Sequence, residues 1–94
     1  MPKAILAGET VAESDDTVIV EGNHYFPPGA VKREFFAPSD KTSHCPWKGD
    51  ASYLSVNAGG TTAPSAAWFY PDPKQEAENI RDHVAFWGDV EVVE

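Results

Sequence analysis

The sequence predicts a mainly β fold: a small domain of two antiparallel sheets with one short helix. The chain has 94 residues, a length typical of a single domain covering residues 1–94. Its β-forming residues occur in short runs separated by Gly, Pro, Asp and Asn. Only one segment carries the start signals of a helix. With 41% hydrophobic and 12% aromatic residues, the chain has enough apolar surface to form a core.

The first third of the chain is predicted to consist of short strands. Three runs of β-forming residues, separated by polar turn residues, lie at 4–6, 10–12 and 17–20. Residues 23–26 would add a further strand. Pro27-Pro28-Gly29 must end that strand, because proline donates no backbone hydrogen bond to a sheet. Residues 31–37 alternate imperfectly between apolar and polar, and we predict a strand there as well.

The segment 38–50 shows no periodicity and is predicted to be the longest irregular loop of the chain. Strands are predicted at 51–58 and 66–70, with Gly59-Gly60 as the signal of a hairpin turn after the first of them. We expect the loop to fold back over the strand that holds Trp68. That arrangement would leave a hollow rather than a solid interior.

One helix is predicted, over 72–81. Asp72 suits the N-cap position and Pro73 the first helical position. An N–H at that position forms no hydrogen bond within the helix, so proline loses none there. The helix has a narrow apolar face, so we expect it to pack as a lid on the sheet. Residues 84–87 and 90–93 are predicted to close the fold as a hairpin.

The charge of the chain excludes several classes of partner. The formal net charge is −8 and the isoelectric point is near 4.6. Such a surface repels phosphate backbones and anionic headgroups, so we expect no binding to nucleic acid or to a membrane. No apolar run is long enough for a signal peptide or a membrane span. The single cysteine, Cys45, has no intramolecular disulfide partner, which favours a cytoplasmic location.

Residues 39–50 gather most of the reactive side-chain types of the chain. A nearby cation such as His44 or Lys48 would favour the thiolate of Cys45, which makes this cysteine a candidate nucleophile. The alternative is a small buried hydrophobic side chain. Lys48 lies among aromatic residues and is a candidate anion contact. Gly49 is typical of a turn, and the upstream glycine that a phosphate-binding loop requires is missing.

Metal ligands are present as residue types but not in a metal-binding pattern. The candidates are Cys45 and three histidines, His24, His44 and His83. No two of them stand at the spacing of a zinc knuckle or a helical metal motif, so no metal site is expected. The sequence identifies no cofactor.

Aromatic residues form a second group of candidate functional residues. Trp68 and Tyr70 share one face of a predicted strand, and Tyr53 lies on the strand before it. Together with Lys48 and Thr42 they would line an aromatic pocket with a few polar groups, the usual composition of a small-ligand site. The alternative is that the rings form the hydrophobic core, with their polar tips bonded to the main chain.

Three segments resemble a known family: T-S-H-C-P-W-K-G-D-A-S-Y, A-A-W-F-Y-P-D-P and V-A-F-W. Their order and spacing resemble the bacterial and fungal family called domain of unknown function 427, over about Glu9 to Val92. The C-P-x-K-G-x-A-x-Y element is specific to that family. The family is in places described as nucleotidyltransferase-like.

The resemblance implies a β-tent fold, in which two antiparallel sheets meet at an angle, as in methionine sulfoxide reductase B and the ligand-binding domain of cereblon. Many tents are held by zinc through paired C-x-x-C elements. This chain has none, so packing alone is expected to hold the sheets. The family motif falls on Cys45, Pro46, Lys48, Gly49, Ala51, Tyr53, Trp68, Tyr70, Pro71 and Pro73. The sequence departs from the motif at Trp47 and at Asp82-His83, so the end of the helix is expected to differ.

These residues lead to the hypothesis of a small-ligand pocket between the sheets. The candidate ligand-binding residues are Thr42, His44, Tyr53, Trp68 and Tyr70. The candidates for catalysis are Cys45 as nucleophile and Lys48 as stabiliser of developing negative charge. One alternative is a protein-interaction or dimerisation module that uses a sheet edge or an aromatic patch. The other is the nucleotidyltransferase-like enzyme that the resemblance implies. Whether the chain is a monomer or a homodimer stays open, as does whether it catalyses a reaction.

Overall fold

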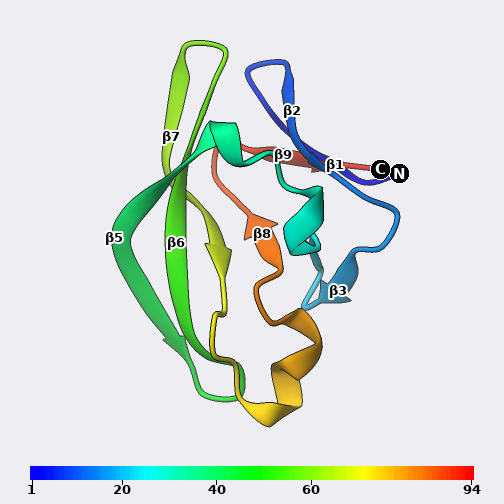
Figure 1. Ribbon diagram of the computed structural model, residues 1–94, viewed down its shortest axis with the longest axis vertical. Coiled ribbons are helices and arrows are strands. Elements are labelled where there is room, and N and C mark those ends of the chain that lie inside the picture. The colour runs from blue at the N-terminus through cyan, green and yellow to red at the C-terminus, as the bar shows by residue number, and fades with distance from the viewer.

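The computed structural model describes residues 1–94 and confirms the mainly β fold (Figure 1). The strands are β1 (Lys3–Leu6), β2 (Glu9–Glu13), β3 (Val18–Val20), β4 (Asn23–Tyr25), β5 (Phe36–Cys45), β6 (Gly49–Ala58), β7 (Thr61–Phe69), β8 (Val84–Phe86) and β9 (Glu91–Val93). Three short 3₁₀ helices lie between them: η1 (Pro28–Ala30), η2 (Arg33–Phe35) and η3 (Gln75–Ile80). None of the helices has the length and apolar character needed to cross a membrane.

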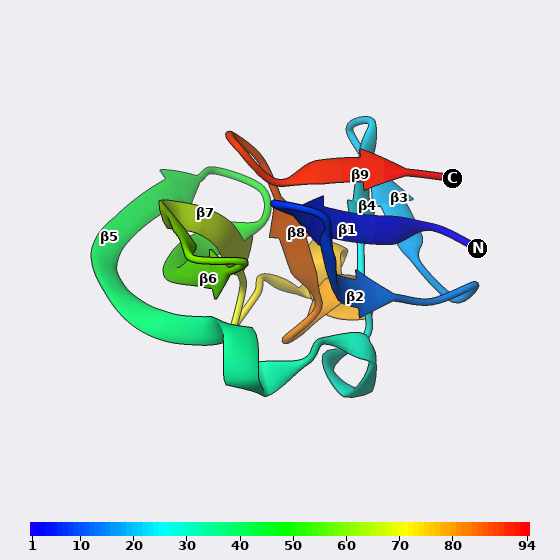
Figure 2. The ribbon, with the colours of Figure 1, turned by 90° about the horizontal axis from the view of Figure 1, so that it is seen from above.

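The strands form three antiparallel sheets. Their orders are β2-β1-β9, β3-β4 and β5-β6-β7-β8. The strands of the three-stranded sheet run across those of the four-stranded sheet, as Figures 1 and 2 both show. The main core, which includes Leu6, Val11, Val56 and Phe86, lies between these two sheets. The sequence predicts two antiparallel sheets, whereas the structure has three, because the hairpin β3–β4 forms a small sheet of its own.

The hairpin of β6 and β7 has the predicted turn. Gly59 and Gly60 have φ values of 56° and 76°, in the left-handed region that glycine adopts without a steric penalty. A Cβ on Gly59 would lie only 2.9 Å from the carbonyl oxygen of Ala7. Because Ala7 belongs to the turn between β1 and β2, the tips of these two hairpins pack together, at the top of Figure 1.

The prediction of a loop over 38–50 is wrong. Most of this segment belongs to β5, the edge strand that pairs with β6, and only residues 46–48 form a turn. An edge strand exposes most of its side chains, so β5 is polar from Ser39 to His44 and lacks there the alternation that is typical of a buried strand. The segment therefore does not fold back over Trp68 as a loop. Instead, β5 curls around β6 and β7 (Figure 2).

The prediction of a strand over 31–37 is wrong except for Phe36 and Ala37, which begin β5. Val31 forms only an isolated bridge with Ala12, and η2 follows it. A strand would place Phe35 and Phe36 on opposite faces of a sheet. The helical turn lets both rings pack against the main core, so tertiary packing decides the conformation here.

The helix predicted over 72–81 is only the short 3₁₀ helix η3. Its N-cap is Lys74 rather than Asp72, and no side chain caps it. Ala77 has φ −116° and ψ 20°, which interrupts the helix. Ala77 and Ile80 are the only buried residues of η3, so no further apolar position favours another turn.

The last two strands form at the predicted places but do not form the predicted hairpin. β8 pairs with β7 in the four-stranded sheet, whereas β9 pairs with β1 in the three-stranded sheet. The turn between them contains Gly88, with φ 67°. This turn carries the chain from one sheet to the other, so the prediction of a closing hairpin is wrong.

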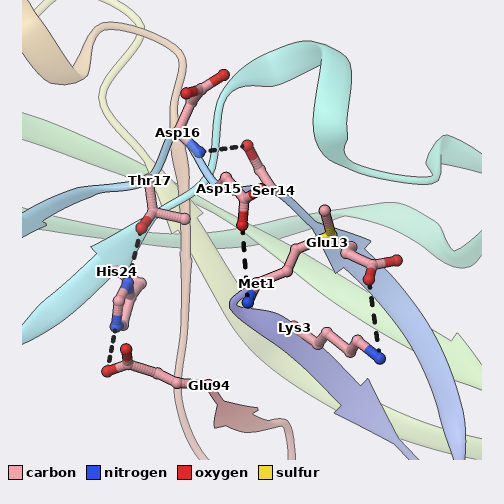
Figure 3. Close-up of polar contacts among 9 residues, drawn as sticks. All are labelled: Met1, Lys3, Glu13, Ser14, Asp15, Asp16, Thr17, His24 and Glu94. Carbon is pink, nitrogen blue, oxygen red and sulfur yellow. Dashed lines mark hydrogen bonds and ion pairs between the residues drawn. The ribbon is translucent and has the colours of Figure 1, made fainter.

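The small hairpin β3–β4 is held in place from two sides. The ring of His24 is hydrogen-bonded to the Thr17 hydroxyl through Nδ1 at 2.7 Å and contacts the Glu94 carboxylate through Nε2 at 3.3 Å (Figure 3). Just after β4, Phe26 exchanges two backbone hydrogen bonds with Val84, at 2.8 and 2.9 Å. These contacts fix a hairpin whose turn reaches the candidate site.

Candidate functional site

The candidate site is centred on Lys48, in the turn between β5 and β6. Gly49 has φ 113°, and a Cβ there would lie 3.5 Å from backbone atoms of Asp72 and Lys74. The backbone N–H of Lys74 donates to the carbonyl oxygen of Lys48 at 2.8 Å, and its Nζ donates to that of Pro46 at 2.5 Å. The turn is thereby held against the segment that precedes η3. Only 5% of Lys48 is exposed.

Lys48 is the one buried charged residue of the protein. Its Nζ forms an ion pair with the carboxylate of Glu21, from the turn of the hairpin β3–β4. The ammonium lies 5.0 Å from the ring centroid of Trp47 and 5.8 Å from that of Tyr70. Burial is the largest single influence and lowers the pKa of Lys48, but the hydrogen bond to Glu21 and the attraction of neighbouring groups together raise it above its ordinary value. The same hydrogen bond lowers the pKa of Glu21, so both groups are charged at neutral pH.

Aromatic rings form the wall beside this ion pair. Tyr53 on β6 and Trp68 on β7 are direct neighbours in register, with ring centroids 6.4 Å apart. The indole Nε1 of Trp68 donates to the Tyr25 hydroxyl at 3.1 Å, and these two rings meet edge to face. Tyr70 is 4% exposed, and this burial raises its pKa to about 12. The wall therefore presents neutral rings whose polar tips lie close to the buried charge.

Two irregular places in the four-stranded sheet position Lys41 and Trp87. The register of β5 shifts around Ser39 and that of β7 around Ser65, and the hydroxyls of these two serines are hydrogen-bonded at 2.6 Å. The carbonyl oxygen of Ser65 accepts a hydrogen bond from the indole of Trp87 at 2.7 Å. The Nζ of Lys41 lies 5.4 Å from the ring centroid of Tyr53 and 6.0 Å from that of Trp87. The bulges thus bring a second lysine over the aromatic wall.

These side chains line one cavity of about 350 Å³. Its lining residues are Glu21, Asn23, Tyr25, Lys41, Lys48, Tyr53, Trp68, Tyr70 and Trp87. Aromatic rings make up most of the wall, and two ammonium groups and one carboxylate supply the charge. This size and composition suit a small organic molecule.

A larger cavity, of about 540 Å³, is lined by residues of the opposite face of the same sheet, among them Leu54, Phe69 and Val84. Its charged lining residues are Arg33 and Asp82, and both are exposed. No predicted site residue lines it, and it has no buried polar group. We therefore place the candidate site at the smaller cavity.

The structure brings four of the predicted site residues together. Those that line the smaller cavity are Lys48, Tyr53, Trp68 and Tyr70. Thr42 and His44 lie outside it and are exposed, and His44 is hydrogen-bonded to Asp50 at 2.7 Å. Because β5 is a strand, its side chains alternate. Lys41 and Ser43 face Tyr53, which directs Thr42 and His44 to the other side.

Cys45 does not line the cavity either. It is half-buried and packs against the smaller core cluster that contains Tyr25, Ala51 and Tyr70. This placement corresponds to the alternative interpretation of Cys45 as a small hydrophobic side chain.

Five of the lining residues are absent from the predicted site: Glu21, Asn23, Tyr25, Lys41 and Trp87. Glu21 and Asn23 flank Gly22. The glycine indicates a turn, but the sequence does not indicate which strand this turn lies against. The position of Lys41 can be predicted from strand alternation. In a strand, Lys41 and Ser43 lie on the same face, so a strand over this segment places Lys41 on the face of Tyr53. No group of three or more His, Cys, Asp or Glu side chains is arranged to hold a metal ion.

The fold and the site define a small, mainly β domain with an aromatic cavity around a buried lysine. The chain belongs to the family described as a domain of unknown function (DUF427), which it matches over residues 3–94. This confirms the resemblance drawn from its sequence motifs. The short name of the family, NTP_transf_9, refers to nucleotidyl transfer, whereas its description assigns no activity. No curated protein matches the chain.

Proposed function

We propose that this domain binds a small planar ligand whose oxyanion or carbonyl group meets Lys48. The observation that carries the proposal is the convergence of Lys48, Tyr53 and Trp68 on one cavity. Removing an ammonium group from water is costly, so a lysine that is 5% exposed and lines a cavity is well suited to a negatively polarised ligand atom. The rings of the wall would stack against the plane of the ligand.

The charges around the cavity support an anionic ligand, although the chain as a whole is acidic. Lys41 and Lys48 line the cavity together with one carboxylate, that of Glu21. Glu21 is paired with Lys48, while Lys41 contacts aromatic rings and forms no ion pair. The lining therefore has a net positive charge within a chain of net charge −8. This local charge would attract an oxyanion.

The same geometry limits the chemistry that we propose. Lys48 is placed to stabilise negative charge on a bound ligand. We propose no nucleophilic role for Cys45, because it lies outside the cavity. A single carboxylate lines the site, whereas two-metal nucleotidyl transfer uses paired carboxylates. The proposed function is therefore ligand binding. We propose a cytoplasmic location, because the one cysteine is free.

A titration with probes that share one ring tests the proposal. The probes are benzoate, benzamide and benzylammonium, which carry an anion, a neutral carbonyl and a cation. The indole N–H signals of Trp68 and Trp87 in an NMR spectrum report on the cavity, because both residues line it. We expect benzoate or benzamide to shift these signals at millimolar concentrations, and benzylammonium to leave them unchanged.

A pair of lysine variants provides the control. Lys48→Met keeps the aliphatic stem and removes the charge, so benzoate should bind at least about tenfold more weakly. Lys32→Met removes an exposed lysine outside the cavity and should bind benzoate like the unmodified protein. The proposal fails if no probe shifts the indole signals, or if the two variants bind equally. A stable dimer without any probe response in sedimentation would favour the interaction module instead.

A further inference from the structure

The ion pair of Lys48 shows what already occupies the polar end of the cavity. Glu21 precedes Lys48 by 27 residues and comes from a different sheet. The side chain of Lys48 is 7% exposed, whereas that of Glu21 is 54% exposed. The carboxylate therefore reaches the buried ammonium from the open side of the cavity, the side from which a ligand would enter.

We infer that Glu21 occupies the position of the ligand's oxyanion and leaves Lys48 when the ligand binds. This inference rests on the proposed function. The other groups that face the ammonium are the rings of Trp47 and Tyr70, at 5.0 and 5.8 Å, and a ring face is a much weaker partner than a carboxylate. The carboxylate position of Glu21 is thus the place where a strong acceptor meets Lys48.

Glu21 can leave this position without disturbing the fold. It lies in a tight turn with Gly22, where the φ values are 54° and 82°. The backbone pairing of β3 with β4 joins Val18 to Tyr25 and Val20 to Asn23, and it does not involve the Glu21 side chain. A rotation about side-chain bonds is therefore enough to move the carboxylate into water.

The need to displace Glu21 defines the class of ligand. A neutral carbonyl accepts a weaker hydrogen bond from an ammonium than a carboxylate does, so it is a poor replacement for Glu21. A ligand carboxylate or phosphate replaces the lost charge. Once Glu21 has left, Lys41 and Lys48 both lack a carboxylate partner, which favours two negative charges on the ligand. The ligand is therefore a molecule with a planar ring and an oxyanion group. Because a neutral analogue displaces Glu21 poorly, Glu21 selects against such analogues.

Removal of the Glu21 charge tests this inference. Glu21→Gln keeps the size of the side chain and should bind benzoate about tenfold more tightly, since the competing charge is gone. Glu21→Asn is a second variant that suits a positive φ and should show the same gain. Glu34→Gln, at an exposed position outside the cavity, is the matched control and should show none. Phenyl phosphate, titrated alongside, distinguishes a phosphate preference from a carboxylate preference.

The outcomes separate this inference from the proposed function. If Lys48→Met weakens benzoate binding while both Glu21 variants bind it no more tightly than the unmodified protein, the proposed function stands and Glu21 is not a competitor. If the Glu21 variants bind benzoate more weakly, Glu21 belongs to the ligand's own contacts and the inference is overturned. If neither the unmodified protein nor any Glu21 variant binds benzoate or phenyl phosphate, the inference fails, and if benzamide does not bind either, the proposed function fails with it. A cooperative thermal unfolding transition without ligand would show that the variants are folded.

Discussion

The two faces of the four-stranded sheet are built from the same strands but differ in chemistry. On one face, Val56 and Phe86 pack into the main core against the three-stranded sheet. On the other face, Tyr53 and Trp68 line a cavity that contains a buried ion pair. Because alternate residues of a strand point to opposite faces, one backbone can hold both environments. The comparison teaches that stability and binding depend on separate sets of side chains here, and substitutions should affect them separately.

The largest effect on stability is expected on the apolar face. Phe26 is fully buried and its ring meets that of Phe86 edge to face, with centroids 5.6 Å apart. Phe26→Ala should lower the free energy of unfolding by about 3–5 kcal/mol. This is a large part of the roughly 5–15 kcal/mol that a domain has in total. Urea unfolding followed by tryptophan fluorescence measures the change.

A matched change on the cavity face sharpens this first prediction. Trp87 is 50% exposed, so Trp87→Ala should lower the free energy of unfolding by much less than Phe26→Ala. Equal losses for the two variants would contradict the proposed separation of the faces.

The next effect is a loss of stability at high pH that comes from the cavity face. The folded-state pKa of Tyr70 is about 12, above the ordinary value of 10.0, because the phenol is buried. The stabilising contribution of this phenol is therefore complete below pH 10, and it is lost as the pH rises toward 12, since the unfolded chain releases its proton first. The loss should reach about 3 kcal/mol.

Tyr70→Phe isolates this contribution from those of other groups that titrate at high pH. The difference in free energy of unfolding between the unmodified protein and Tyr70→Phe should be constant up to about pH 9 and should then shift in favour of the variant. Chemical unfolding at a series of pH values measures the difference. A difference that does not change with pH would contradict the burial of this phenol.

The smallest effect concerns the hydrogen bond from Trp68 to the Tyr25 hydroxyl, at 3.1 Å. A double-mutant cycle with Trp68→Phe and Tyr25→Phe should give a coupling energy of about 1 kcal/mol. The same variants should also move the indole signals of the remaining tryptophans, because Trp68 lines the cavity. A coupling energy near zero would show that the rings are held by packing alone.

Local signals predicted the parts of the fold that depend on neighbouring residues. Gly59-Gly60 predicted a turn because two positive φ values are needed there, and β6 and β7 flank it as expected. The edge strand β5 was missed, because an exposed strand needs no apolar alternation. Asp72 and Pro73 predict a longer helix than η3, because they are typical of a helix start. The length of the helix depends on how many of its residues are buried, and only Ala77 and Ile80 are.

The candidate site was predictable to a similar extent. Tyr53, Trp68 and Lys48 were identified because rings and an isolated lysine cluster near one another along the chain. Glu21 and Trp87 were not, since each reaches the cavity from a distant part of the sequence. A loop over 38–50 would allow Thr42 to reach the cavity, whereas the alternation of the strand β5 turns its side chain away.

By itself, the sequence determined the β class, the family and the positions of most strands, because propensity, turn chemistry and motif spacing act over a few neighbouring residues. Only the tertiary structure decided which strands pair, as β9 shows by joining β1 rather than β8. Only the tertiary structure placed Glu21 against Lys48. Strand pairing and ion pairing between distant segments depend on the packing of the whole chain, and no short stretch of sequence carries that information.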